Sequence, residues 1–430
     1  EEVVVTALGI KKESKKLGYS ATSVNTEELV TNRTTNVMES LEGKVAGLNI
    51  TPPAAGAGSS TQIRLRGQSA FAGANNAPLI VINGLPMDQG ARGVNGAGEQ
   101  RDRGDNLQNI NPDDIESMTV LKGATAAAIY GARAANGAII ITTKSGKAGQ
   151  GIGVDFTSSF TSSQPLNFMD ELSQTEYGIG TGGVRPQTQG DAQSFGQFGF
   201  GERLDGAPTI NFDGQMRPYS AYPYQLFDFL RNGSNFTNTL GLSGSTGNGS
   251  FRVSFSNVDA SGIQPMNEYT KRIFNVGINH NLSEKLMVQL NINYANEYNL
   301  NPPQIGTQGD GAINFFNRMG ISTPIDAYRE NAGAELRTNG FLGTLNNPFY
   351  PIQGNQYFKE RRNRLLGTAT VRYAITDWLF AQGRFNFDYG TAFSEWNRLN
   401  GTGSTTLFQD DRTYRGTYNL AQTTTTECCT

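Results

Sequence analysis

Strict alternation of apolar and polar residues governs the chain from residue 151 onward, and it restricts the fold more than any other feature. In residues 285–298 every second residue from Leu286 to Tyr294 is apolar, whereas the opposite face is rich in asparagine. A period of two is typical of a strand with one apolar and one polar face. Eight segments follow this pattern: 152–163, 236–245, 249–258, 271–282, 285–298, 364–375, 378–391 and 412–421. They predict eight strands of about 10–14 residues, longer than the usual soluble strand of about 5–6.

The connections between these segments alternate in length. Short connections at 246–248, 283–284 and 376–377 separate longer ones at 164–235, 259–270, 299–363 and 392–411. Transmembrane β-barrels show this alternation, with tight periplasmic turns and larger extracellular loops, and about 9–11 tilted residues cross a bilayer. We therefore predict an antiparallel transmembrane β-barrel wall. A soluble β-sandwich or β-solenoid has the same period but no reason to alternate its loop lengths.

Composition agrees with β-structure and excludes several classes of function. The 430 residues include 52 glycines and 10% aromatics but only 17% charged residues. The single histidine, His280, and the adjacent pair Cys428 and Cys429 leave no zinc site and no disulfide framework. No apolar run reaches the roughly 18 residues of a membrane-spanning helix, and a pI of about 5.5 argues against a nucleic-acid partner. We predict no enzymatic activity, no catalytic residue, no metal and no cofactor.

Residues 1–150 mix short helix and strand signals and predict a small α+β domain. An eight-stranded closed barrel is filled by its own side chains, whereas barrels that hold a folded plug have about 22 strands. Such a plug could not enter a barrel of eight strands. We therefore expect that this chain is a piece of a larger protein with about eight of about 22 strands. The expected organisation is 1–13 as an N-terminal segment, 14–150 as the α+β domain, 151–422 as the first part of the barrel, and 423–430 as an unassigned tail that lacks alternation.

Four ordered blocks in the first domain resemble the plug of TonB-dependent outer-membrane transporters. They are SLEGKVAGL at 40–48, IRLRG at 63–67, PLIVING at 78–84, and 111–144 with NPDDIESMTVLKG and YGARAANGAIIITTK at its two ends. This version resembles the SusC/RagA branch typical of Bacteroidetes. The plug-signature residues that we single out are Arg64, Arg66, Gly67, Lys122, Gly123, Tyr130, Gly131, Arg133 and Gly137. Arg64 and Arg66 are expected on one strand face, and the resemblance implies that such arginines pair with barrel carboxylates.

The N-terminus resembles a TonB box, the segment through which such transporters contact TonB. The residues concerned are Glu2, Val3, Val4, Val5 and Thr6. A short β-prone segment of this kind can add as a strand to the sheet of a partner, with backbone hydrogen bonds giving affinity. An ordinary edge strand is the alternative interpretation. The resemblance therefore implies TonB of the inner-membrane energising complex as a partner.

The resemblance also implies a function and a location. It implies active import of oligosaccharides or peptides across the outer membrane of a Gram-negative bacterium, with outer-membrane lipid around the barrel and a SusD-like surface lipoprotein as partner. The segment DGQMRPY at 213–219 resembles the first large extracellular loop of that branch, and Tyr219, Tyr222 and Tyr224 are candidates for contact with substrate or partner. Two alternatives stay open. The protein is a secreted β-rich adhesin or glycan-binding protein, or the chain is a client of another outer-membrane machine.

Overall fold

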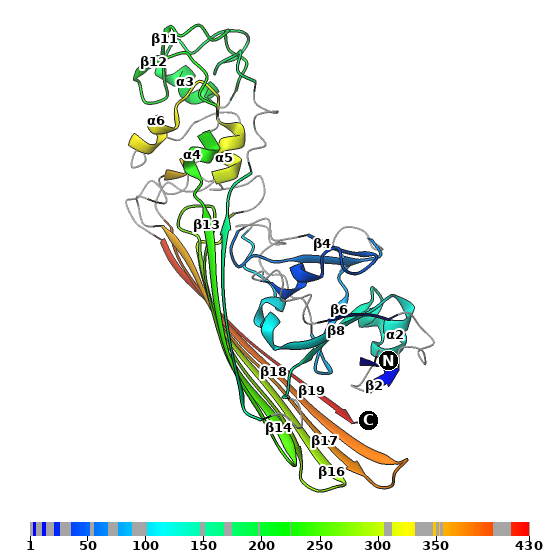
Figure 1. The fold of residues 1–430 in the computed structure, drawn as a ribbon. Helices are drawn as coiled ribbons and strands as arrows, with labels where there is room; N and C mark the ends of the chain where they lie inside the picture. The colour runs from blue at the N-terminus through cyan, green and yellow to red at the C-terminus, as the bar shows by residue number, and fades with distance from the viewer. Residues whose placement is uncertain are drawn as a thin grey trace.

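A tall twisted sheet, a compact body against one face of it, and a group of short helices beyond one end make up the molecule (Figure 1). The computed structural model describes residues 3–5, 11–13, 21–25, 36–51, 56–67, 76–87, 101–146, 151–166, 174–196, 198–223, 225–304, 312–331, 347–349, 352, 356–398 and 414–429. We call the tall sheet the wall, the compact body the plug, and the group of short helices the loop module.

Within the described residues, the wall is a sheet of eight antiparallel strands in sequence order. The strands are β10 (Gly153–Ser163), β13 (Gly233–Thr246), β14 (Gly249–Ser261), β15 (Glu268–Asn281), β16 (Leu286–Leu300), β17 (Tyr357–Ala374), β18 (Phe380–Arg398) and β19 (Tyr414–Cys429). Each of the eight predicted strands is present, and the short connections all lie at one end of the sheet. Among the described residues β10 and β19 do not pair with each other, so this part of the wall is open.

Seven of the eight wall strands extend beyond the predicted bounds, and β17, β18 and β19 extend the furthest. The prediction of a strandless tail from residue 423 is wrong, because β19 continues to Cys429 in register with β18. Backbone pairing requires no alternation of side chains, and the β-branched threonines of this segment favour an extended chain. Likewise β17 begins at Tyr357 rather than 364, because its first residues are charged and hide the apolar period.

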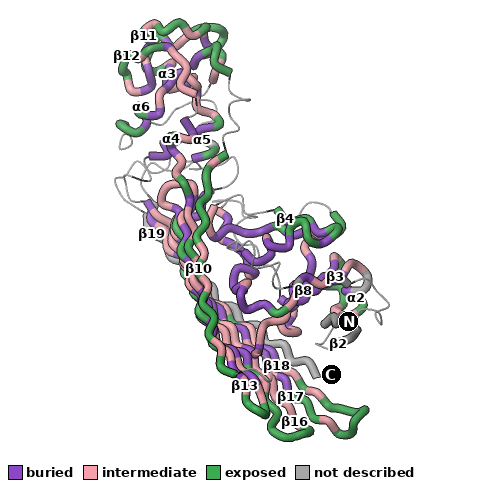
Figure 2. The backbone as a smooth tube through the Cα atoms, viewed as in Figure 1, coloured by how far each residue is buried: buried purple, intermediate pink, exposed green. Residues whose placement is uncertain are grey.

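The two faces of the wall differ as the alternation predicts. One cross-strand row on the face away from the plug runs through Phe156, Leu240, Phe255, Phe274, Tyr294, Leu365 and Tyr389. Most of these side chains are exposed, Phe156 by 68%, as expected for a surface that faces lipid. On the opposite face, polar residues such as Arg252, Ser254 and Lys271 are buried, and Figure 2 shows the buried stretches of the wall.

The plug is built around a mixed sheet with strand order β3-β8-β9-β6-β7 in its described part. Its strands are β3 (Ala21–Asn25), β6 (Leu79–Ile82), β7 (Leu85–Met87), β8 (Ile115–Leu121) and β9 (Ala138–Thr143), with a separate pair of β4 (Leu48–Thr51) and β5 (Gln62–Leu65). Its helices are η3 (Val37–Leu41), η4 (Leu107–Asn109), η5 (Pro112–Asp114), α2 (Ala124–Tyr130) and η6 (Ala132–Ala134). Fully buried residues such as Met38, Ile80 and Met118 form its core, which confirms an α+β plug.

The loop module combines two long connections that lie far apart in the sequence. It contains α3 (Gln189–Phe195), β11 (Pro208–Ile210), β12 (Met216–Pro218), α4 (Gln225–Phe229), α5 (Ala312–Arg318) and α6 (Ile325–Glu330). Its core is aromatic: Phe212 stacks on Tyr328 with ring centroids 4.5 Å apart, and Phe315 meets Tyr328 edge-on at 4.9 Å. Of the helices that the structure describes, none has the length and apolar character needed to cross a membrane.

Candidate functional site at the contact of plug and wall

Plug residues 101–114 and 143–146 contact the polar face of strands β14 to β18, and we call this contact the seam. The seam follows from local sequence rules. Asn111 caps η5 by accepting a hydrogen bond from the amide of Asp113, and Pro112 occupies the first helical position, where no N–H is needed. This turn presents the carboxylate of Asp114 to the wall directly before β8 begins.

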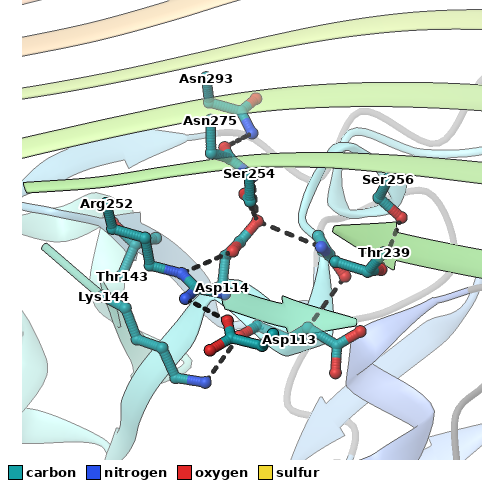
Figure 3. Close-up of polar contacts among 12 residues, drawn as sticks. Asp113, Asp114, Thr143, Lys144, Thr239, Arg252, Ser254, Ser256, Asn275 and Asn293 are labelled. Carbon is teal, nitrogen blue, oxygen red and sulfur yellow. Dashed lines mark hydrogen bonds and ion pairs between the residues drawn. The ribbon is translucent and has the colours of Figure 1, made fainter. Parts of the chain in front are cut away.

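Asp114 is the centre of the largest polar cluster of the seam (Figure 3). Its carboxylate accepts hydrogen bonds from Arg252 Nε at 3.1 Å and from Ser254 Oγ at 2.6 Å, and a further short one from the Asn275 amide. Arg252 also donates through Nη1 to Asp155 Oδ2 of β10 at 2.6 Å. The side chains of Asp114 and Arg252 are 3% and 9% exposed, so this is a buried ion pair. Removing either partner leaves a buried charge without compensation, which makes such a pair sensitive to substitution.

The end of β9 provides a second group of contacts beside Asp114. Lys144 Nζ donates to the Asp113 carbonyl oxygen at 2.7 Å, and burial together with the charge of Arg252 lowers the pKa of Lys144. Ser250 Oγ donates to the Ser145 carbonyl oxygen at 3.2 Å. The plug backbone comes so close to β15 here that a Cβ at Gly277 would lie 2.9 Å from the Lys144 carbonyl oxygen. Glycine at position 277 therefore permits the close approach.

A third group of contacts holds plug residues 105–109. Lys271 Nζ donates to the Gln108 carbonyl oxygen at 2.9 Å, and Tyr269 donates its hydroxyl to Gln108 Oε1 at 3.0 Å. Arg362 donates to the Asp105 carbonyl oxygen at 3.1 Å and lies 3.5 Å from Glu297. Asn293 of β16 also donates to the Asn109 carbonyl oxygen at 3.2 Å, so a single plug segment is tied to β15, β16 and β17.

Asp105 connects the seam to the rest of the plug. Its carboxylate accepts hydrogen bonds from the amides of Thr61 and Leu107, each at 2.9 Å, and from the side-chain amide of Asn36. Burial raises the pKa of Asp105 from 3.8 to about 6, although the two backbone amides partly oppose this shift. Asp105 thus joins η3, β5 and η4 through one buried carboxyl group.

A cavity of about 30 Å³ lies within the seam. Asp114, Lys144, Arg252 and the amides of Asn291 and Asn293 are among its lining residues. The Oδ1 atoms of Asn291 and Asn293 are buried and have no hydrogen-bond partner in the structure. The contact of plug and wall is therefore polar and incompletely packed, unlike the interior of either part.

The arginines of the plug signature do not take the expected positions. Strand β5 ends at Leu65, so Arg66 lies beyond it with a φ of 62° and is exposed, whereas Arg64 is half-buried. The expectation that both side chains lie on one strand face is therefore wrong, and their pairing with barrel carboxylates stays a prediction. The plug-to-wall ion pairs that the structure shows include those of Asp114 with Arg252, and of Arg103 with Glu360 at 3.2 Å.

The remaining signature residues occupy turns around the short helices of the plug. Gly123, Gly131 and Gly137 have φ values of 61°, 73° and 99°, a region that favours glycine. Gly67 follows Arg66 and is exposed, Lys122 precedes α2, Tyr130 is the last residue of α2, and Arg133 lies in η6. A Cβ at Gly137 would lie 2.8 Å from the Leu121 carbonyl oxygen, so this position is restricted by packing as well. A direct contact of these residues with a ligand stays a prediction.

The TonB-box residues and the loop tyrosines have different outcomes. Val3–Val5 forms β1, paired antiparallel with β2 (Lys11–Glu13), while Glu2 and Thr6 lie outside the described residues.

Tyr219 is 1% exposed and donates its hydroxyl to the Ile179 carbonyl oxygen at 2.7 Å, so the expectation that it contacts substrate is wrong. Its ring fills the interior of the loop module. Tyr222 is half-buried, and Tyr224 lies outside the described part of the chain.

The charged residues of the seam were not singled out by the sequence reasoning. Five of them are Asp114, Arg252, Lys271, Glu360 and Arg362. The sequence contains a signal for the four wall residues among these five. Each is a charged residue at an inward position of a strand whose other inward residues are mostly small or neutral polar groups. A charge placed there requires a partner, and the plug is the surface that faces it.

Comparisons with known proteins agree with this architecture. A family model described as the TonB-dependent Receptor Plug Domain matches residues 13–138. The TonB-dependent receptor SusC of Bacteroides thetaiotaomicron is 42% identical over 178 residues, which are 41% of this chain and 17% of that protein. The TonB-dependent receptor P26 of Formosa agariphila is 26% identical over 414 residues, 95% of this chain and 37% of that protein.

Solved structures show the same fold. The RagAB peptide importer in its open-open state matches with a TM-score of 0.65 and 19% sequence identity, over 94% of this chain and 44% of that chain. The chain thus spans less than half the length of the relatives that it matches. The chain therefore carries a TonB-dependent receptor plug domain at residues 13–138, and its plug and the eight wall strands that the structure describes resemble the TonB-dependent receptors of the SusC/RagA type.

Proposed function

We propose that the protein imports oligosaccharides or peptides actively across the outer membrane, with the plug closing the lumen until TonB pulls on the N-terminal segment. The observation that carries this proposal is the polar seam. Side-chain hydrogen bonds and ion pairs, such as those of Asp114 and Lys271, attach the plug to the wall, while the plug core remains separate. Polar contacts of this kind re-form with water when they separate, because donors and acceptors keep partners in both states.

The seam also indicates where resistance to a pulling force lies. Residues 101–114 and 143–146 carry the contacts with the wall, whereas Val3–Val5 lies near the start of the chain and pairs only with β2 in the described structure. A partner strand that replaces β2 gains the backbone hydrogen bonds of β1 without disturbing the seam. TonB is the partner that the family assignment supports for this segment.

The loop module supports the proposed partnership with a SusD-like surface lipoprotein. It is a preformed body at the end of the wall where the long connections lie, and its tip exposes apolar side chains such as Phe200, which is 72% exposed. The related RagAB structure is named a peptide importer, which keeps peptides beside oligosaccharides as substrates. The plug and the TonB-dependent relatives argue against a secreted adhesin, and the captured-client alternative stays untested.

The decisive experiment uses the full-length protein in its native outer membrane. Deletion of Glu2 to Thr6 is expected to leave substrate binding unchanged and to abolish uptake of a labelled peptide mixture and a labelled oligosaccharide mixture, measured in parallel. A finer pair is Val4→Pro, which removes a backbone donor, and Val4→Ala, which keeps it. We expect Val4→Pro to abolish uptake and Val4→Ala to retain most of it. Unchanged uptake after the deletion would rule out TonB-dependent import.

A further inference from the structure

A second cavity, of about 90 Å³, lies where the plug, the rim of the wall and the loop module meet, and we call it the rim cavity. Its lining includes Arg101 of the plug, the wall connections 264–266 and 301–304, and Phe229 and Ala312 of the loop module. Arg101 reaches the wall there through a backbone bridge to Gln304 and a hydrogen bond from Nη1 to the Pro302 carbonyl oxygen at 2.9 Å. All three parts of the molecule thus contribute to one partly open cavity.

The backbone is strained on two sides of the rim cavity. Met266 and Asn301 have φ values of 64° and 47°. Four non-glycine residues of the described chain have positive φ, and two of them line this cavity. Asparagine tolerates this conformation, but an unbranched bulky residue such as methionine adopts it rarely. Strain of this kind gathers at ligand-binding positions, where the surrounding structure stabilises it.

The polar groups of the rim cavity match a peptide. Asn301 Nδ2 and Gln304 Oε1 are buried and have no hydrogen-bond partner in the structure. Asn301 therefore offers a hydrogen-bond donor and Gln304 an acceptor. Together they complement the C=O and the N–H of a peptide unit. Arg101 is the only charged side chain among the described lining residues, so the cavity favours an anionic group such as a terminal carboxylate.

The apolar part of the lining suits a side chain better than a sugar ring. Met266, Pro303 and Ile352 are among the residues that provide it. Sugar recognition uses an open aromatic face, and both aromatic rings of the described lining are already packed. Phe229 lies 5.1 Å from Phe316 and 5.4 Å from Phe349 between ring centroids, and Lys359 Nζ lies 3.9 Å from the centroid of Tyr357.

We propose that the rim cavity binds the carboxyl-terminal end of an imported peptide. The terminal carboxylate pairs with Arg101, the preceding peptide group bonds to Asn301 and Gln304, and one apolar side chain fills the space beside Met266. This inference rests on the proposed import function and specifies its substrate class as peptides with a free carboxyl terminus.

The test measures binding directly, without TonB. Purified full-length receptor in detergent is incubated with a proteolytic peptide digest, with the same digest amidated at its carboxyl groups, and with a mixture of maltooligosaccharides. Retained molecules are quantified by mass spectrometry. We expect retention of the free-acid digest to exceed that of the amidated digest by about tenfold, the scale of one charge-assisted contact. Arg101→Gln is expected to remove this preference, and Arg203→Gln, an exposed arginine of the loop module, is expected to keep it.

A second variant tests the space rather than the charge. Ala312→Leu fills the cavity without altering Arg101 and is expected to lower retention of both digests, and hydrogen exchange of α5 and α6 checks that the loop module stays folded, because Ala312 also belongs to its core. Retention of maltooligosaccharides alone, or a free-acid preference that persists in Arg101→Gln, would overturn the inference. The proposed function is judged separately, because it fails only if the deletion of Glu2 to Thr6 leaves uptake intact.

Discussion

The seam and the loop module both join segments that are far apart in the sequence. The loop module is held by aromatic packing, whereas the seam is held by polar and charged contacts. The loop module joins its two connections through stacked and edge-on rings such as Phe212, Phe315 and Tyr328. The seam joins plug to wall through a buried ion pair and hydrogen bonds to Asp114 and Gln108. Apolar burial yields stability that is lost when the parts separate, whereas polar contacts exchange their partners for water. The difference indicates that the loop module is a permanent body and the seam a separable contact.

The largest expected effect breaks the loop module. Phe315→Ala removes ring contacts with Phe316 at 5.3 Å and Tyr328 at 4.9 Å and is expected to destabilise the module by about 4 kcal/mol. Hydrogen exchange should show lost protection in α5 and α6 and unchanged protection in β8 and β9. Phe200→Ala, at a site that is 72% exposed, is the control and should change protection little. Equal loss of protection in β8 would show that the two regions are not independent.

A smaller effect is expected at the seam. Asp114→Ala leaves Arg252 with Asp155 alone, and we expect loss of about 3 kcal/mol in the attachment of the plug, because the arginine stays buried. The measurement is hydrogen exchange of β8 and β9 in the full-length receptor. Asp155→Ala is the matched control, because it removes the other partner of Arg252. The side chain of Asp155 is 54% exposed, so its loss is expected to cost less than that of Asp114. If both variants lose the same protection, Asp114 has no special role in holding the plug.

Acidification is expected to change stability the least. A fall in pH raises the stability of the plug through Asp105, whereas it lowers that of the loop module through Asp205 once the pH is below 3.8. The folded pKa of Asp105 is raised to about 6, so its contribution to stability is fully present below its ordinary pKa of 3.8 and is lost as pH rises through 6. Lowering pH from 7 to 4.5 should therefore stabilise the plug, by about 2 kcal/mol from this group. In the loop module, Arg185 lowers the pKa of Asp205 to about 2, so the stability that Asp205 contributes persists until pH falls below its ordinary value of 3.8.

To test the role of Asp105, the urea concentration at the midpoint of plug unfolding is measured at pH 7 and at pH 4.5. Asp105→Asn keeps an acceptor for Thr61 or Leu107 but cannot titrate, and it is expected to remove the acid-induced gain. Asp155→Asn, which changes an exposed carboxylate, is the control and should keep the gain. A gain of the same size in Asp105→Asn would assign the pH dependence to another group.

Much of the fold could be predicted from local patterns. The alternation places each of the eight wall strands, and Gly123, Gly131 and Gly137 mark turns that the structure contains. Errors occur where the pattern weakens. The charged start of β17 hides its apolar period, and the threonines of β19 form a strand through backbone pairing with β18 alone. Arg66 was assigned to a strand because its spacing from Arg64 fits, but the chain turns after Leu65.

The candidate site was predicted far less well than the fold. The plug motif at 111–144 includes Asp114, but no local rule distinguishes it from Asp113, and only the wall shows which of the two carboxylates meets Arg252. Tyr219 was expected at a binding surface and is buried, because residues of its own long connection, such as Ile179 at 40 positions' distance, fold back over it.

The sequence by itself determined the strands, their two faces, the plug and the family that the chain resembles, because periodicity and motifs are properties of neighbouring residues. Only the tertiary structure decided which groups meet across the seam and the rim cavity. Those contacts join Asp114 to Arg252 and Arg101 to Gln304, residues separated by well over a hundred positions, and their energies depend on burial that no local pattern records.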